Sequence, residues 1–117
     1  MSFLFLGGII TMTWIYLIIA GLLEVCWSTT MKLSNGFTNL VFSISTVVGM
    51  VLSFGFLALA IKHLPLSISY PIWTGIGAVG SIIVGVVLFK DQISPITWVF
   101  IVMLVVGIIG IKVTSGH

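Results

Sequence analysis

Charged residues are what this sequence has least of. Only five per cent of its 117 residues are charged and sixty per cent are hydrophobic, whereas about a quarter of an ordinary soluble domain is charged. This balance excludes a water-soluble globule. The single cysteine, Cys26, excludes an intrachain disulfide. No cluster of Cys, His and Asp has metal-ligand spacing, and no nucleophile is paired with a base. The sequence therefore predicts no metal site, no cofactor and no enzyme.

Long hydrophobic runs make up most of the chain. They are interrupted only at residues 32–36, 62–65 and 90–95, where lysine and other polar residues occur together with glycine or proline. One bilayer crossing needs about 20 apolar residues. The sequence therefore predicts an all-α membrane protein, with residues 1–117 forming one domain of four transmembrane helices. The four spans are expected near residues 13–31, 38–61, 66–89 and 96–113.

The segment before the first span, residues 1–11, could be mistaken for a signal peptide. It carries no basic residue, and no polar gap separates it from the first span. We therefore expect it to extend the first helix or to lie at the membrane interface.

The four basic residues are lysines at the ends of the predicted helices. Such positions suit lipid headgroups rather than nucleic acid. With four crossings, Lys62 and Lys112 lie on one side of the membrane and Lys32 and Lys90 on the other. The positive-inside rule orients a protein by an excess of lysine and arginine on the cytoplasmic side. Two lysines against two select no orientation, so two copies could insert in opposite directions.

Glu24 is the only acidic residue inside a long apolar stretch. A carboxylate in the hydrocarbon core costs several kcal/mol, so such residues usually face a cavity or a partner and carry function. A carboxyl group there can bind a proton in one state and a cation in another. The alternative is a protonated glutamate that hydrogen-bonds between helices. Glu24 is the first candidate for a proton and substrate site.

Residues on the face of Glu24 and on one face of the third helix could line such a site. On the first helix, Gly21 and Trp27 lie three residues from Glu24 on its face, so they could supply space and a ring for cation–π contact. On the third helix, one continuous face places a tyrosine, a tryptophan, a threonine and a glycine in successive turns. These residues are Tyr70, Trp73, Thr74 and Gly77.

The second helix offers Ser53, which ends a stripe of small residues at a spacing of four. Such a stripe allows close helix packing, and Ser53 could instead donate a hydrogen bond to Glu24; both interpretations stay open. Residues 75–80 match G-x-G-x-x-G, but no strand precedes them, so a dinucleotide site is rejected. Gly75 and Gly77 are better interpreted as a possible helix hinge.

Four helices of about 10–12 Å diameter pack solid or leave one cleft, and one carboxylate makes a sparse ion pathway. An antiparallel homodimer would place two copies of Glu24 around a shared chamber. Transporters often use inverted repeats to alternate access about a midplane site. We therefore expect a second copy of the chain as a partner.

From about Met12 to Ser115 the chain resembles the small multidrug resistance family. The matching segments are AGLLEVCW with MKLSNGF, SYPIWTGIGAVG, LFKDQ and GIIGIKVTS. Trp27, the segment WTGIGAVG and Lys112 are similar to the guanidinium-exporter branch of the family. Residues 1–11 precede the usual start. Ser28-Thr29-Thr30 is closer to the drug-exporting branch, and Ser69 and Pro71 depart from the usual sequence around the site tyrosine.

This resemblance implies a multi-pass protein of the cell (inner) membrane that exports guanidinium-type cations in exchange for protons. Glu24 would be the shared ligand of proton and cation, and the site lining would be Gly21, Trp27, Ser53, Tyr70 and Trp73. The alternative within the family is an exporter of quaternary ammonium ions or lipophilic drugs. Outside transport, the alternative is an assembly subunit or a heterodimer partner.

Overall fold

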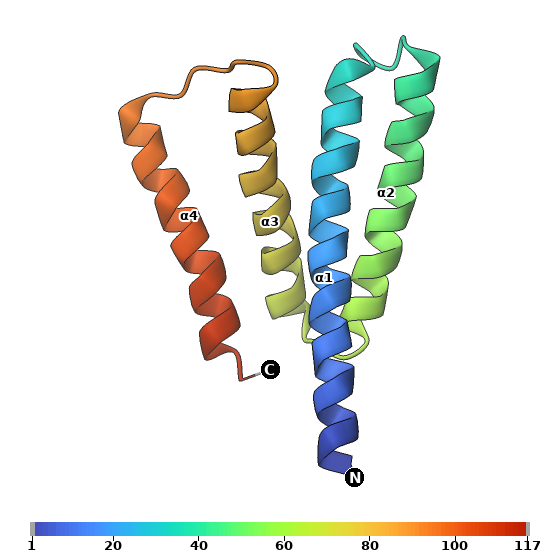
Figure 1. The fold of residues 1–117 in the computed structure, drawn as a ribbon, viewed down its shortest axis with the longest axis vertical. Coiled ribbons are helices and arrows are strands. Elements are labelled where there is room, and N and C mark those ends of the chain that lie inside the picture. Colours follow the sequence, from blue (N-terminus) through green and yellow to red (C-terminus); the bar gives the residue numbers. More distant parts are fainter. Residues whose placement is uncertain (1, 117) are drawn as a thin grey trace.

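The computed structural model describes residues 2–116, with side chains from residue 7 onward. It contains four helices, long and apolar enough to cross a membrane, and the described residues form no strand. The helices are α1 (Ser2–Leu33), α2 (Leu40–Ile61), α3 (Leu66–Val87) and α4 (Pro95–Thr114). Figure 1 shows them running alternately up and down, with the two termini toward the same end. The predicted all-α membrane fold is confirmed.

The helix boundaries follow local sequence signals. Asn39 caps α2 by accepting a hydrogen bond from the backbone N–H of Phe42 at 3.2 Å. Ser94 caps α4 in the same way, accepting from the N–H of Thr97 at 3.4 Å, and Pro95 is the first helical residue. Both residue types are favoured at these positions. The starts of α2 and α4 therefore follow from these local signals.

The first helix begins earlier than the predicted span. α1 starts at Ser2 and continues without interruption to Leu33, because the early residues are apolar and contain no proline to end it. Its portion Gly7–Leu33 alone is long enough to cross a bilayer. The expectation that residues 1–11 extend the first helix holds for the residues described.

The helices pack unequally. α1 is central and packs against both α2 and α3, and α2 also meets α3, whereas the backbone of α4 packs only along α3. The buried core lies between the first three helices and includes Leu17, Ala20, Ala60 and Trp73. No residue of α4 is buried. The core therefore positions residues of α1, α2 and α3 against one another and leaves α4 at one edge (Figure 1).

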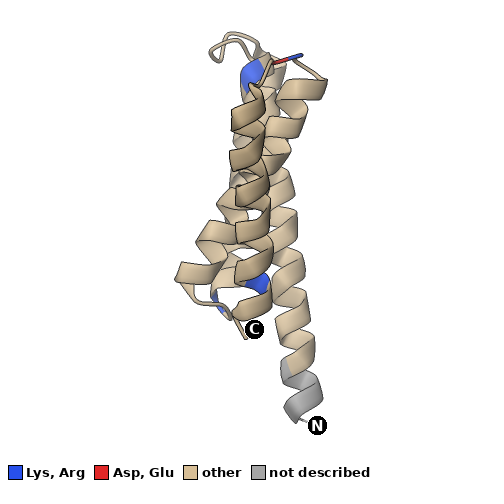
Figure 2. Ribbon diagram, turned by 90° about the vertical axis from the view of Figure 1, so that its left-hand side faces the viewer, with Lys and Arg blue, Asp and Glu red and all other residues tan. Residues whose placement is uncertain are grey.

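The protomer is a slab rather than a closed bundle. Its Cα atoms extend over 52 × 36 × 19 Å, so in one direction it is less than two helix diameters thick. The lysines form two groups along the long axis, one at the end opposite the termini and one near the C-terminus, with the N-terminal part of α1 extending beyond the second group (Figure 2). Lys112 also reaches inward, with its Nζ 4.5 Å from the centroid of the Trp14 ring.

Candidate functional site

Glu24 lies where α1 meets α3. Its carboxyl group contacts the backbone of Gly77, and a Cβ atom added to Gly77 would overlap the carboxyl group. Glu24 itself is half-buried, and its Oε2 is buried without a hydrogen-bond partner among the described residues. Such atoms are rare, and each one calls for an explanation such as a functional role or an absent ligand. The carboxyl group therefore has an unused acceptor inside the apolar part of the protein.

Gly77 fits this contact because it has no side chain. From the sequence, Gly77 was expected on the same face of the third helix as Tyr70 and Trp73 and was interpreted as a possible hinge. α3 is continuous from Leu66 to Val87, with Pro71 inside it. The direct neighbour of the carboxyl group is thus a residue for which sequence reasoning offered a different role. The signal that could have identified it is its place four residues after Trp73.

A hydrogen-bonded network ties the third helix to the turn that carries Glu24. The Trp73 Nε1–H donates to the Ser53 Oγ at 3.0 Å and lies 3.2 Å from the Ala20 carbonyl oxygen. The Ser53 hydroxyl in turn donates to the same Ala20 carbonyl at 2.7 Å. Ser53 is fully buried and Trp73 nearly so. In an α-helix the carbonyl of Ala20 also accepts from the backbone N–H of Glu24.

This network decides between the two interpretations of Ser53. Its proton is directed at Ala20, so the serine does not donate to the Glu24 carboxyl group in this structure. Ser53 instead links Trp73 to the carbonyl of Ala20, one helical turn before Glu24. A buried hydroxyl bonded in this way rigidifies its surroundings, because breaking the bond strands a polar atom.

Aromatic rings surround Trp73. Its ring meets that of Tyr70 edge-on at 5.5 Å between centroids and that of Phe54 at 5.6 Å, which is the preferred geometry of aromatic pairs. Tyr70 is 51% exposed on the single protomer, so it is available to a ligand or a partner. Phe54 had no signal in the sequence, because it is one of eight phenylalanines and carries no polar group.

Trp27 is fixed at its Cβ, whereas its indole N–H has no hydrogen-bond partner among the described residues. Its Cβ lies against Gly49 of α2, where an added Cβ would come within 2.8 Å. This close approach agrees with the predicted stripe of small residues on the second helix. The Trp27 Nε1–H is buried and lacks a hydrogen-bond partner among the described residues. An unpaired donor on Trp27 and an unpaired acceptor on Glu24 therefore lie one turn apart on the same helix.

The remaining predicted site residues make apolar contacts. The space beside Gly21 is filled by Ile76 of α3, and the space beside Gly75 by Ile108 of α4. Gly21 thus allows α3 to approach α1, and Gly75 allows α4 to approach α3. Within the described part of the chain, no three residues among His, Cys, Asp and Glu are placed to hold a metal ion.

Taken together, the first three helices supply a carboxyl group, an unpaired indole N–H, a fixed indole–hydroxyl pair and one exposed tyrosine ring. A carboxyl group without a fixed cation can take up either a proton or a cation. Ring faces attract cations as well. The arrangement suits reversible exchange of a small cation against protons.

Comparison with known proteins assigns the chain to a family. Residues 12–104 match the family model described as Small Multidrug Resistance protein. A guanidinium exporter of Escherichia coli strain K12 is 45% identical over 104 residues, covering 89% of this chain and 99% of that protein. Guanidinium exporters of Salmonella typhimurium and Proteus vulgaris are 46% and 45% identical and cover the same share of this chain and 99% and 100% of their own lengths. The chain therefore belongs to the small multidrug resistance family and is a multi-pass protein of the cell membrane.

Proposed function

We propose that this protein exports guanidinium-type cations across the cell membrane in exchange for protons, and acts as a transporter rather than an enzyme. The observation that carries the proposal is the Glu24 carboxyl group, which lies at the α1–α3 contact with an unpaired oxygen. The chain around it is about 45% identical to proteins named guanidinium exporters. That likeness favours guanidinium over the quaternary ammonium alternative.

In this mechanism one carboxyl group serves two ligands. Deprotonated Glu24 binds the cation, and protonation of Glu24 releases it, so proton and cation cannot occupy the same carboxyl group together. Entry of protons down their gradient then drives export of the cation. Trp27, Ser53, Tyr70 and Trp73 would line the cation site, and Gly21 would allow the close helix approach that shapes it.

The polar groups of this site suit guanidinium in particular. Guanidinium is planar, rich in N–H donors, and able to stack on aromatic faces. Glu24 offers acceptor oxygens, and the exposed Tyr70 offers a ring face that the buried Trp73 ring supports edge-on. A quaternary ammonium ion has no N–H donor and needs apolar space instead.

We further propose that the working unit is an antiparallel homodimer. One protomer is only 19 Å thick, and α4 buries no residue, so a large apolar face lacks a protein neighbour. A second copy would cover that face, add a second Glu24 and complete the chamber. The two-against-two distribution of lysines permits the copies to insert in opposite directions.

The transport proposal predicts a clear substrate preference. Proteoliposomes that contain the purified protein, with an imposed pH gradient, are expected to exchange protons for guanidinium and to move tetraethylammonium at least about tenfold more slowly, because only guanidinium can donate to the carboxylates. Protein-free liposomes give the background. Transport of tetraethylammonium without transport of guanidinium would replace this proposal with the quaternary ammonium alternative.

The dual-insertion proposal predicts that a tag at the carboxyl terminus is found on both sides of the membrane. Lys62→Ala combined with Leu33→Lys changes the balance from two against two to one against three, and is expected to give one predominant orientation. Accessibility of the tag to a membrane-impermeant reagent, before and after lysis, measures this distribution. A uniform location in the unmodified protein would contradict dual insertion.

A further inference from the structure

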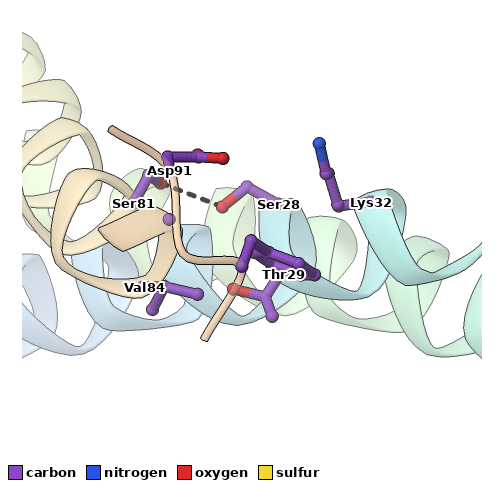
Figure 3. A pocket seen from close by; sticks show the side chains of 8 residues that line it. Ser28, Thr29, Lys32, Ser81, Val84 and Asp91 are labelled. Atoms are coloured by element: carbon purple, nitrogen blue, oxygen red, sulfur yellow. Dashed lines mark hydrogen bonds between the residues drawn. The ribbon is translucent and has the colours of Figure 1, made fainter. Parts of the chain in front are cut away.

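A second polar feature lies outside the Glu24 site, at the end of the molecule where α1 and α3 terminate. It is a cleft of about 140 Å³ between the last turns of the two helices and the loop that follows α3 (Figure 3). Its lining combines hydroxyl groups, one ammonium group, one carboxylate and one aromatic ring. The lining residues are Ser28, Thr29, Lys32, Ser81, Val84, Gly85, Phe89 and Asp91.

The cleft lies along the same α1–α3 contact as Glu24, further toward the C-terminal ends of the two helices. The Glu24 carboxyl group lies against Gly77. Four residues further along each helix, the hydroxyl groups of Ser28 and Ser81 share a hydrogen bond of 3.0 Å (Figure 3). Residues that are four apart lie on the same helix face. The serine pair therefore forms the wall of the cleft nearest to Glu24, and the cleft lies between Glu24 and one end of the protein.

The carboxylate of the cleft is held against the end of α3. The Asp91 N–H donates to the Gly85 carbonyl at 2.9 Å, and Lys90 adopts a positive φ of 55° that turns the chain back toward the helix. A Cβ on Gly85 would lie 2.7 Å from the Asp91 Oδ2. The absence of a side chain at Gly85 thus leaves the space that the carboxylate occupies.

Negative groups gather at this carboxylate, and two lysines, Lys32 in the cleft and Lys90 next to Asp91 in the sequence, oppose them. Both α1 and α3 direct their C-terminal ends at this end of the molecule, and a helix C-terminus carries a partial negative charge. Asp91 adds a full negative charge beside the α3 terminus. Lys32 is the one cation that lines the cleft, and its Nζ lies 5.5 Å from the centroid of the Phe89 ring. The Phe89 ring therefore already contacts one cation, the Lys32 ammonium group.

We propose that this cleft is an outer cation site, through which the transported cation passes between Glu24 and water. Asp91 accepts the N–H groups of a guanidinium-type cation, and the Phe89 ring stacks on its plane in place of the Lys32 ammonium group. A carboxylate and an aromatic face are the two partners that a guanidinium group matches best. The choice of guanidinium rests on the proposed function; the cation site itself rests on the geometry of the cleft.

Lys32 has a defined role in this proposal. It is a tethered cation that occupies the ring when the site is empty, and its charge opposes a second cation nearby. It therefore keeps the outer site weak, so that a cation released from Glu24 moves on into water. Binding at the outer site is expected on the order of millimolar, as suits an exposed site with one carboxylate.

The test uses the full-length Glu24→Gln protein in lipid nanodiscs, which removes the charge of the inner site. Guanidinium chloride is titrated against sodium chloride at constant ionic strength, and NMR follows the backbone amides of Gly85 and Asp91. We expect saturable shifts with guanidinium but not with sodium. Adding Asp91→Asn should weaken the binding by about tenfold or more, because the amide removes the only carboxylate of the cleft.

A matched pair of lysine variants separates specific from general charge effects. Lys32→Gln is expected to tighten guanidinium binding about threefold or more, whereas Lys62→Gln, the same change at the opposite end of the molecule, leaves it unchanged. Absence of saturable shifts at Gly85 and Asp91, or equal effects of both lysine variants, would overturn the outer site.

Transport by the unmodified protein distinguishes this outcome from failure of the proposed function. Transport of guanidinium by the unmodified protein, without saturable shifts in the Glu24→Gln protein, contradicts only the outer site. Saturable shifts in the Glu24→Gln protein, without guanidinium transport by the unmodified protein, contradict only the proposed function.

Discussion

Replacing Glu24 with glutamine is expected to reduce proton-driven guanidinium transport to the background of protein-free liposomes. The amide keeps the shape of the side chain and its place beside Gly77, but it can neither carry a negative charge nor exchange a proton. Both ligands of the proposed mechanism therefore lose their shared group. The measurement is guanidinium uptake into proteoliposomes under an imposed pH gradient.

Two controls show whether this loss is specific. The glutamine variant should have the elution volume of the unmodified protein in size-exclusion chromatography and the same helical circular dichroism, because the packing of α1 is retained. Glu24→Asp keeps the carboxyl group on a shorter side chain and should retain measurable, slower exchange. Continued exchange of guanidinium against protons by the glutamine variant would disprove the shared-carboxyl mechanism.

The second large effect is expected from Gly77→Ala. The added methyl group overlaps the Glu24 carboxyl group, so the carboxyl group must move away from its position between α1 and α3. Misplacing a functional group by about 1 Å can cost about 100-fold in rate, and we expect transport to fall by about 10- to 100-fold. Initial uptake rates at matched protein density test this.

The matched control is Gly55→Ala on α2, where no atom beyond the adjacent residues and backbone of α2 itself lies within 4 Å of the added Cβ. Alanine favours a helix over glycine by up to about 1 kcal/mol at either position, so intrinsic helix stability cannot explain a difference between the two variants. Gly55→Ala should keep most of the transport rate. Equal rates for both variants would show that the contact between Gly77 and Glu24 is unimportant.

The fold was largely predictable because the membrane restricts it so strongly. Apolar runs of sufficient length, broken by three short polar segments, admit few arrangements other than four neighbouring helices. The boundaries of α2 and α4 lie within two residues of the predicted spans. The start of α1 at Ser2 agrees with the expected extension of the first helix into residues 1–11, whereas hydropathy alone does not show where the membrane-crossing part of that helix begins.

The candidate site was predictable only in part. Glu24 could be predicted because it is an acidic residue in an apolar run. The spacing of the aromatic and small residues on the third helix was enough to place them on one face. Side-chain partners are different, because they depend on how two helices cross. Ser53 could reach either Glu24 or the Ala20 carbonyl, and only the structure shows that it donates to Ala20. The contact between Gly77 and Glu24 was missed for the same reason, whereas Phe54 was missed because it carries no polar group that distinguishes it from the other phenylalanines.

The position of α4 at the edge of the buried core has a genetic consequence. The candidate site is carried by α1, α2 and α3, while α4, with no buried residue, is left for the proposed pairing of two copies. If two copies pair as proposed, a Glu24→Gln chain with an intact α4 is expected to pair with working chains and to inactivate the mixed dimers in a cell that makes both forms, so its allele should be dominant. An allele that damages the exposed face of α4 should yield chains that cannot pair, and it should be recessive.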